Sequence, residues 1–302
     1  MPAAGRSLLV WIAAAVVSAC GGGAGEESHE PYDLRVGAWN VERLGLEPDT
    51  DYGLLARVVE ENFDVVAVEE VMWVDGGHPG YDRLLVELGP GWDGFVTDGQ
   101  RPDVEETYAE YYAVLWRRAL VRPCAGWTGL VYHADAANVF SREPAFACLE
   151  AGFGMDGVAG TVGFDFVLAA YHAIWAGGDT VVTAAEVDHL DEVLAAMAAA
   201  CPGEGDVLIA GDFNLEAGPI EAVVDATVLT EGGGSTLSDT GSISLNLIDH
   251  VLVQDPAATG ESAGPATILD VRAMAGSNAA YRDTASNHLP VQALFTVSED
   301  DD

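Results

Sequence analysis

The sequence predicts an α/β fold, and three observations lead to that prediction. Short apolar runs lie between polar segments, as strands buried on both faces do, and residues 207–210 (Val-Leu-Ile-Ala) are the clearest of them. Segments with apolar residues at helical spacing alternate with these runs. Polar side chains directly follow several of the runs. With 302 residues, 49% of them apolar, the chain can fill a sizeable core.

The first 19 residues are typical of a targeting segment. Arg6 precedes an apolar run at residues 8–17 that is too short to span a bilayer as a permanent helix. Residues 17–20, Val-Ser-Ala-Cys, resemble the lipobox of bacterial lipoproteins, which implies cleavage before Cys20, lipid attachment to its sulfur and display on the cell envelope. The alternative is a simple secretory signal with an incidental Cys20, which would give a secreted protein. Residues 20–31 are rich in Gly and Glu and predict a flexible tether.

The charge balance limits the partners of this protein. All 12 basic residues are Arg, and 49 acidic residues give a formal net charge of −37. The acids are dispersed, which is typical of a heavily hydrated surface. Such an excess opposes broad, sequence-independent attraction to a polyanion. A phosphate-bearing substrate would therefore have to be captured locally, by a few Arg side chains and bound metal.

Three cysteines remain beyond Cys20, namely Cys124, Cys148 and Cys201. In an oxidising compartment a pair among them can form a disulfide. Cys124 and Cys148 flank segments that are expected to be neighbouring strands, so this pair is the first choice and leaves Cys201 single. The sequence contains no cluster of Cys and His with the spacing of a zinc site.

The mature domain is expected to begin near residue 32 with a strand–helix–strand unit. Residues 34–40 alternate as a strand that ends at Asn40. Residues 52–61 have one apolar face and predict a helix, and residues 64–68 predict a buried strand that is followed by Glu70. Strands that end on one edge of a sheet can bring Asn40 and Glu70 together, although thirty positions separate them.

The middle of the chain predicts a helix at residues 81–88 and a loop rich in Gly and Pro through residue 103. Residues 108–117 then predict a long strand with an aromatic, half-buried face. Glu110 is unusual because it lies inside this β-prone run, where it can point into a cleft. Tyr108 opens the same strand.

Two further strands are predicted next, at residues 145–149 and 164–172. The first follows Ser-Arg-Glu-Pro at 141–144, which includes Arg142, and the second ends in His172. A long Ala-rich helix is expected from Thr183 or Ala184 to Ala200. Thr183 is the predicted N-cap because Glu186 follows three residues later.

The stretch around residues 206–214 is the centre of the predicted site. A buried strand ends in Gly, and Asp212 and Asn214 follow at i, i+2 spacing, which points both side chains the same way if the backbone stays extended. A strand with Asp249 is predicted at 246–253, and polar residues including Asn287 and His288 precede a last strand that ends near 295. Residues 299–302 form an acidic tail.

Six motifs occur in the order seen in the endonuclease/exonuclease/phosphatase superfamily, and the chain resembles that superfamily over nearly all of residues 32–297. The residue patterns at Tyr108, Glu110 and 141–144 resemble its deoxyribonuclease I-like branch. The resemblance implies one domain, residues 32–298, folded as a four-layer α/β sandwich in which two mixed β-sheets pack face to face with helices outside. The six motifs are Trp39-Asn40, Glu69-Glu70-Val71, His172, Gly211 to Asn214, Ile248-Asp249-His250 and Ser286 to Val291.

The resemblance also implies a divalent-metal-dependent phosphoesterase and a role for each motif residue. Glu70 is the main ligand of Mg²⁺ or Mn²⁺, with Ca²⁺ as an alternative, and Asn40 supports it. Asp212 orients or deprotonates the attacking water, and Asn214 hydrogen-bonds the phosphoryl oxygen. Two His–carboxylate pairs, His288 with Asp249 and His172 with Glu110, bind phosphate or transfer a proton. Arg142 and Tyr108 contact the phosphate and sugar of the substrate.

Two residues depart from the family pattern. Glu69 stands where the family usually has Gln, and Asn287 stands where it usually has Asp. Asn287 keeps an oxygen donor for the metal side of the site but loses the charge, so affinity for a second metal should fall.

The sequence therefore predicts a nuclease with nucleic acid as substrate, attached to the membrane through Cys20, monomeric and without an evident protein partner. A phosphatase or a phospholipid or sphingomyelin phosphodiesterase is the alternative within the enzyme class, because the same fold serves all of them. Lipid hydrolysis would require exposed apolar hairpins for membrane docking. An inactive envelope binding module is the alternative from another class.

Overall fold

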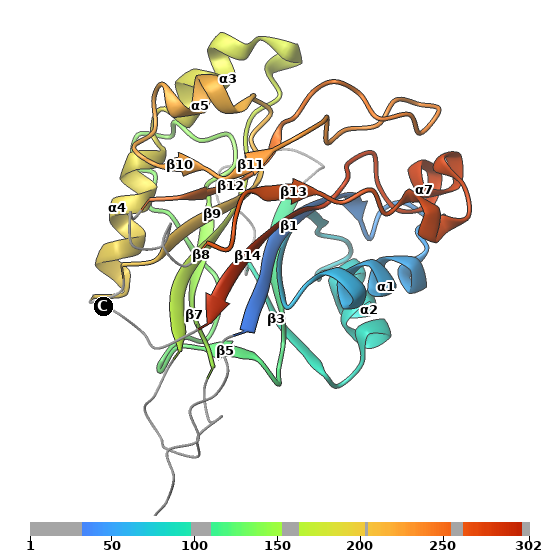
Figure 1. Cartoon of the computed structure of the whole chain (residues 1–302), viewed down its shortest axis with the longest axis horizontal. Helices are drawn as coiled ribbons and strands as arrows, with labels where there is room; N and C mark the ends of the chain where they lie inside the picture. Colours follow the sequence, from blue (N-terminus) through green and yellow to red (C-terminus); the bar gives the residue numbers. More distant parts are fainter. Residues whose placement is uncertain (1–31, 98–109, 153–162, 203–204, 255–261, 298–302) are drawn as a thin grey trace, which may run out of the picture.

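The structure is a computed structural model that describes residues 32–97, 110–152, 163–202, 205–254 and 262–297. The signal segment, the tether with Cys20, Tyr108 and the acidic tail lie outside these residues. Figure 1 shows two sheets in the middle of the molecule, with α1 and α2 on one side and α3 and α4 on the other. The predicted four-layer α/β sandwich is confirmed.

The first sheet has the strand order β11-β13-β14-β1-β2-β4-β3. Its central pair, β1 and β2, is parallel, and β14 and β4 flank this pair in antiparallel directions. The sheet is therefore mixed. The strands are β1 (Tyr32–Leu44), β2 (Val65–Met72), β3 (Trp92–Val96), β4 (Glu110–Arg117), β11 (Thr230–Glu231), β13 (Ala266–Ile268) and β14 (Val291–Val297).

The second sheet has the order β10-β12-β9-β8-β7-β5, and a short β6 also pairs with β7. Here β8 and β9 are the parallel pair, with His172 opposite Asp212. Carboxyl ends of parallel strands meet at one edge of a sheet, so each sheet contributes a pair of polar strand ends. The strands are β5 (Val121–Pro123), β6 (Val131–Tyr132), β7 (Ala145–Ala151), β8 (Phe164–His172), β9 (Val207–Asp212), β10 (Thr227–Val228) and β12 (Asp249–Val253).

Helices cover the outer faces of both sheets. Those beside the first sheet are α1 (Tyr52–Asn62), α2 (Pro79–Leu88), the 3₁₀ helix η2 (Arg272–Ala275) and α7 (Asn278–Thr284). Those beside the second sheet are η1 (Ala176–Gly178), α3 (Thr180–Val187), α4 (Leu190–Ala200) and α5 (Ala217–Glu221).

The continuous apolar runs of the sequence follow from burial on both strand faces. In β9, Leu208 and Ala210 lie in the core between the sheets, whereas Val207 and Ile209 lie in the core under α4. The alternation places neighbouring residues on opposite faces, and both faces are covered. The same arrangement in β2 explains why residues 65–68 contain no polar side chain.

The predicted long helix at 183–200 is wrong in one respect, because two helices occupy this stretch. α3 ends at Val187 and α4 begins at Leu190, and the N-cap of α3 is Asp179, whose side chain accepts from Val181 N. The expected capping pair of Thr183 and Glu186 is instead buried inside α3. Thr183 Oγ1 donates to the carbonyl of Ile174 at 2.9 Å. Thr183 and Glu186 therefore form tertiary hydrogen bonds instead of the predicted capping pair.

Other differences concern strand ends and short elements. β1 does not end at Asn40 but continues through a register shift to Leu44. The expected loop through residue 103 contains β3, and short elements such as β10, β11, β13, α5 and α7 lie in regions without clear patterning. A two-residue strand cannot show a period, so its partners rather than its sequence define it.

The predicted disulfide is confirmed, since Cys124 and Cys148 are bonded. It joins the end of β5 to β7, which are hydrogen-bonded neighbours. Cys201 is buried at the end of α4 and is not part of this disulfide. Among the helices that the structure describes, none is long and apolar enough to cross a membrane.

Candidate active site

Asp212 and Asn214 form the floor of the candidate site at the end of β9. Gly211 has a φ of 152°, and a Cβ there would lie 1.9 Å from the carbonyl oxygen of Tyr171, so only Gly allows the close approach of β8. The backbone then turns rather than staying extended. Asn214 has a φ of 47°, and its N–H donates to Asp212 Oδ1 at 2.9 Å. The two side chains share one site, as predicted, through a tight turn.

Asn40 and Glu70 come from the two parallel strands of the first sheet. Glu70 has a φ of 56° within the irregular part of β2. Its Oε1 accepts from Asn40 Nδ2 at 3.1 Å, and its Oε2 accepts from the backbone N–H of Arg43 at 3.0 Å. Both carboxylate oxygens are thereby fixed in direction, as a metal ligand requires.

The His288–Asp249 pair is buried at the junction of the two sheets. Nδ1 of His288 lies 2.9 Å from Asp249 Oδ2 and 3.0 Å from Oδ1. The backbone around His288 is also held, because its N–H donates to Ser286 Oγ and its carbonyl accepts from the Tyr281 hydroxyl. Burial opposes the charge on His288, but Asp249, Asp212 and Glu70 outweigh it and raise the pKa of His288 to about 10.

His172 lies on the other side of Asp212. Its Nε2 is 3.5 Å from Asp212 Oδ2, and its Nδ1 is 3.3 Å from Glu110 Oε2. The same Glu110 oxygen lies 3.2 Å from Arg142 Nε. Arg142 also donates to the carbonyls of His172 and Ala173, each at 3.2 Å. Arg142 therefore fixes the His172 segment, and contact with a substrate stays a prediction.

One oxygen, Asp212 Oδ2, is where these groups converge. It accepts from Asn40 Nδ2 at 3.2 Å and lies 3.6 Å from His288 Nε2 as well as 3.5 Å from His172 Nε2. One amide donor, Asn40 Nδ2, and two imidazole nitrogens, all from segments far apart in the sequence, thus surround a single carboxylate oxygen. This arrangement supports a carboxylate that positions a water molecule and passes its proton onward.

Glu69 is an acidic residue whose environment the sequence did not reveal. It is fully buried, and neither carboxylate oxygen has a hydrogen-bond partner among the described residues. Its Oε1 would be 3.0 Å from a Cβ at Gly211, which places it directly under the site floor. Burial, followed by the carboxylates of Asp249 and Asp212, raises the pKa of Glu69 well above its usual range. This shift favours the neutral form of the Glu69 carboxyl over the charged form.

The residues fit a divalent cation at Glu70. The site offers hard oxygen donors, and the carboxyl groups of Glu70 and Asp212 both accept hydrogen bonds from Asn40. Oδ1 of Asn287 is buried without a hydrogen-bond partner in the described part of the chain, so this oxygen is a candidate ligand for the ion. Glu70, with Asn40 in support, would hold the ion, and Asn287 remains the third residue that the sequence predicts on the metal side.

Asp212, Asp249 and His288 form a second group of possible metal ligands, but their chemistry fits a metal ion less well. Ligand-type atoms of Asp212, Asp249 and His288 all lie within 4.8 Å of one another. Both oxygens of Asp249, however, face His288 Nδ1, and His288 is held protonated. A protonated imidazole offers no lone pair to a metal. These three residues are better described as a His–carboxylate pair beside a second carboxylate.

Sequence reasoning missed three supports of the site. Ser286 Oγ donates to the carbonyl of Asn40 at 2.6 Å and so ties β1 to the His288 segment. The backbone N–H of Arg43 holds Glu70, and the Tyr112 hydroxyl accepts from the N–H of His172 at 3.2 Å. Ser286 lies inside a recognised motif and could have been found there. The other two contacts depend on backbone geometry that a sequence pattern does not specify.

The fold and this site together define a metal-dependent phosphoesterase. The chain belongs to the endonuclease/exonuclease/phosphatase family, whose sequence model matches residues 37–288. A curated deoxyribonuclease from Thioalkalivibrio sp. (strain K90mix) is 32% identical over 275 residues, which cover 87% of this chain and 71% of the relative. The resemblance seen in the sequence is confirmed.

Solved structures agree on the fold. A protein of the same family from Bacteroides thetaiotaomicron has a TM-score of 0.59 at 15% identity and covers 90% of this chain and 97% of its own. D. rerio TDP2 complexed with single-strand DNA product has a TM-score of 0.55 at 14% identity, covering 87% of this chain and 98% of its own. At these identities the likeness shows the fold alone.

Proposed function

We propose that this phosphoesterase is a nuclease that cleaves DNA and acts outside the cytoplasm. The observation that carries the proposal is the convergence of Asn40, His172 and His288 on Asp212 Oδ2, which is the geometry that hydrolysis of a phosphodiester needs. The relative from Thioalkalivibrio named a deoxyribonuclease supports DNA as the substrate. The complete set of site residues argues against an inactive binding module.

Each residue of the proposed active site has a separate role in the reaction. Asp212 orients the attacking water and accepts its proton, since Asn40, His172 and His288 converge on its Oδ2. His288, held charged by Asp249, places a positive group beside the negative charge that develops on the phosphoryl oxygens. The amide of Asn214 has two hydrogens, of which one donates to the carbonyl of Ala173 at 3.0 Å and the other is available to a phosphoryl oxygen.

A divalent ion at Glu70, proposed to be Mg²⁺ or Mn²⁺ with Ca²⁺ as an alternative, neutralises phosphate charge and lowers the pKa of a bound water when present. Asn40 fixes the direction of Glu70 towards this position. Asn287 offers a neutral oxygen there, which favours chemistry with a single ion.

Plasmid nicking tests the proposal. Purified residues 21–302 with Mg²⁺ or Mn²⁺ should nick supercoiled DNA, and EDTA should abolish the activity. Asp212→Ala should lower the rate by about 100-fold or more, whereas the exposed Asp239→Asn on a neighbouring loop should not change it. Absence of DNA and RNA cleavage by a folded, metal-loaded protein that turns over another phosphate ester would contradict the proposal.

We also propose that Cys20 anchors the protein to the cell envelope. The lipobox-like residues 17–20 support it, and so does the disulfide between Cys124 and Cys148, which forms in oxidising compartments. Cys20→Ser should release the protein from membranes into the soluble fraction. Membrane retention of that variant would remove the claim.

One observation favours a second candidate, a phospholipid phosphodiesterase. Residues 235–246 form a hairpin in which Ser235 N donates to Asn246 O and Ser244 N donates to Thr236 O, each at 2.8 Å. Leu245 is 94% exposed on this hairpin, and Ile243 is exposed too. The hairpin base pairs with the segment around His288. Release of a headgroup from phospholipid vesicles, absent in Leu245→Ser, would favour this candidate over DNA cleavage.

A further inference from the structure

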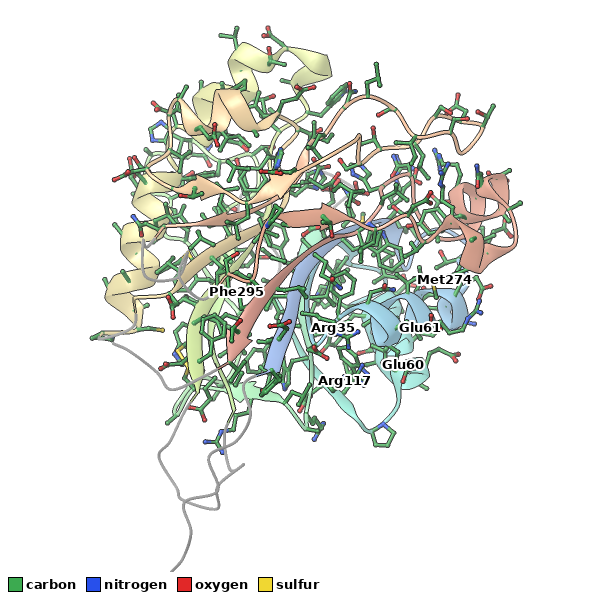
Figure 2. All side chains as sticks on the ribbon, in the orientation of Figure 1. Arg35, Glu60, Glu61, Arg117, Met274 and Phe295 are labelled. Carbon is green, nitrogen blue, oxygen red and sulfur yellow. A yellow bond between two sulfur atoms is a disulfide. The ribbon has the colours of Figure 1, made fainter. Side chains whose placement is uncertain are left out.

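The arginines of this protein leave little positive charge for a phosphate backbone. Among the residues that the structure describes there are ten arginines, and eight of them form ion pairs with an acid. Figure 2 shows two of them, Arg35 and Arg117, at the end of α1 near Glu60 and Glu61. They share the carboxylate of Asp64 and donate to backbone carbonyls there.

The remaining two described arginines lie away from the strand ends that form the site. Arg57 on α1 donates to the carbonyl of Met274, and Arg83 on α2 lies over the ring of Tyr52. With a net charge of −37, the protein cannot hold a nucleic acid by a basic groove. Contacts that carry no charge can add affinity beyond the scissile phosphate, and base stacking is one of them.

Trp175 is an aromatic side chain placed for such a contact. It is 55% exposed, and no other aromatic residue in the described parts of the chain falls in the exposed class. It follows His172 by three positions, so its Cα lies at most about 11 Å from that of His172. The residue two before it, Ala173, accepts hydrogen bonds from both Asn214 and Arg142. Trp175 thus stands at the rim of the active site.

The backbone that carries Trp175 is held by buried groups. Ile174 N donates to Glu186 Oε1 at 2.9 Å, and the Ile174 carbonyl accepts from Thr183 Oγ1 at 2.9 Å. Glu186 is itself buried and also accepts from the Tyr171 hydroxyl. This explains why Thr183 and Glu186 do not cap the helix. Their hydrogen bonds fix the segment that presents the indole.

The turn after Trp175 keeps its ring exposed. Ala176, Gly177 and Gly178 have φ values of 47°, 64° and 86°, so the chain reverses within three residues. A Cβ at Gly178 would lie 3.6 Å from the Trp175 ring, so the ring lies along this turn and leaves its other face to solvent. A left-handed conformation is unfavourable for Ala, and the buried contacts of the segment offset this strain.

We infer that the indole of Trp175 is a stacking site for a nucleobase next to the scissile phosphate, and that the enzyme prefers DNA with unpaired bases. The inference rests on the proposed nuclease function and deepens it. Stacking needs an open base face, which a single strand or a frayed end presents and an intact duplex does not. It is also insensitive to the acidic surface, unlike a grip on the phosphate backbone.

A lipid surface is the other partner that an exposed Trp can suit. The carboxylate of Asp179, the N-cap of α3, lies four residues from Trp175, and the N–H of Asp179 donates to the carbonyl of Ala176. An acidic group at this position opposes an anionic membrane and a phosphate backbone alike, so charge does not separate the two partners. The position of Trp175 three residues after His172 favours a base beside the scissile phosphate, and the vesicle assay tests the lipid alternative.

The test compares three variants on three substrates in Mg²⁺. The variants are Trp175→Ala, Trp175→Phe and Val86→Ala, the last a control that truncates an exposed apolar side chain on α2. The substrates are an oligothymidylate of about 20 nucleotides, the base-free ester bis(p-nitrophenyl) phosphate, and phosphatidylcholine vesicles. Binding of the same oligothymidylate to the Asp212→Asn background, followed by anisotropy, separates affinity from turnover.

Trp175→Ala should raise KM and Kd for the oligothymidylate by about 5- to 100-fold with little change in kcat. Trp175→Phe should restore most of the affinity, and neither variant should alter hydrolysis of the base-free ester. Unchanged KM and Kd in a Trp175→Ala enzyme that still cuts DNA would overturn the stacking site and leave the nuclease proposal intact. Hydrolysis of the base-free ester without any DNA binding would overturn both. Loss of vesicle turnover alone in Trp175→Ala would assign the indole to lipid.

Discussion

Asn40 joins the two sheets at the active site, because its Nδ2 on β1 donates to Asp212 Oδ2 on β9 at 3.2 Å. The same nitrogen donates to Glu70 Oε1 at 3.1 Å, and the Asn40 carbonyl accepts from Ser286. One amide thus sets the distance between the predicted metal ligand and the predicted base. A side chain in this position affects both metal affinity and the chemical step.

Asn40→Ala should therefore raise the Mg²⁺ concentration needed for half-maximal activity by about 10- to 100-fold and also lower kcat at saturating Mg²⁺. The physical reason is that Glu70 and Asp212 lose their shared donor and no longer keep a fixed separation. Metal titration of initial rates measures both effects. Asn62→Ala on α1, where the amide caps its own helix, is the matched control. Metal dependence equal to that of the wild type would show that Asn40 does not support the ligand.

The same contacts explain how far the sequence could predict the site. The apolar runs at 65–68 and 207–210 were recognisable as strands because both faces of each strand are buried. The polar residues that follow these runs in the sequence were expected to lie at one edge of a sheet. The structure brings Asn40, Glu70, Asp212 and His288 together there. Their roles in catalysis stay predictions, and Tyr108 and Cys20 lie outside the described residues.

What the sequence could not predict depends on packing between distant segments. The sequence placed a second Glu next to Glu70, but it did not show that Glu69 is fully buried or that burial raises its pKa well above the usual range. The capping pattern at Thr183 and Glu186 is a local signal, but buried partners from β8 and the loop after it compete for both side chains. In each case a contact with a distant segment determines the environment of the side chain, and a pattern within the segment cannot reveal that contact.

Asp249→Asn should lower the pKa of His288 and the rate together. In the folded protein this pKa is raised from an ordinary value of 6.5 to about 10, so charged His288 stabilises the fold fully below pH 6.5 and this contribution is lost as pH rises through about 10. Without the Asp249 charge, only Asp212 and Glu70 oppose the effect of burial, so the pKa of His288 falls from about 10, and kcat should fall by about 100-fold or more at pH 8. NMR titration of the His288 ring and denaturant unfolding between roughly pH 6 and 10 measure the change. An unshifted His288 resonance would contradict the pairing.

Glu69→Gln should stabilise the protein at neutral and alkaline pH. The folded pKa of Glu69 is raised above its ordinary value near 4.5, so the folded state binds more protons than the unfolded state above that pH. Stability is therefore lost as pH rises from 4.5 towards the folded pKa, at about 1.4 kcal/mol per pH unit. Gln has no proton to lose, so the advantage of the variant should grow with pH over that range.

Urea unfolding of both proteins from roughly pH 4 to 8 measures this advantage. Glu60→Gln, an exposed change on α1, is the control and should follow the wild type throughout. Parallel curves for wild type and Glu69→Gln would mean that Glu69 ionises in the folded protein, and the neutral assignment would then be wrong.

Asn287→Asp should tighten the binding of the metal. Oδ1 of Asn287 is buried and lacks a hydrogen-bond partner among the described residues, while its backbone carbonyl is fixed by Leu237 N at 2.7 Å. The Oδ1 atom therefore makes no hydrogen bond to a described residue that the change would break. A carboxylate at this place adds a charged oxygen next to His288, and divalent cations bind more tightly as the number of charged ligands rises.

We expect the half-activating Mg²⁺ concentration to fall by about 10-fold, measured by metal titration of activity and, independently, by calorimetry of Mn²⁺ binding. Asn278→Asp, on the exposed start of α7, controls for added charge alone. Weaker binding or a poorer enzyme would show instead that the neutral amide is adapted to a site already rich in carboxylates.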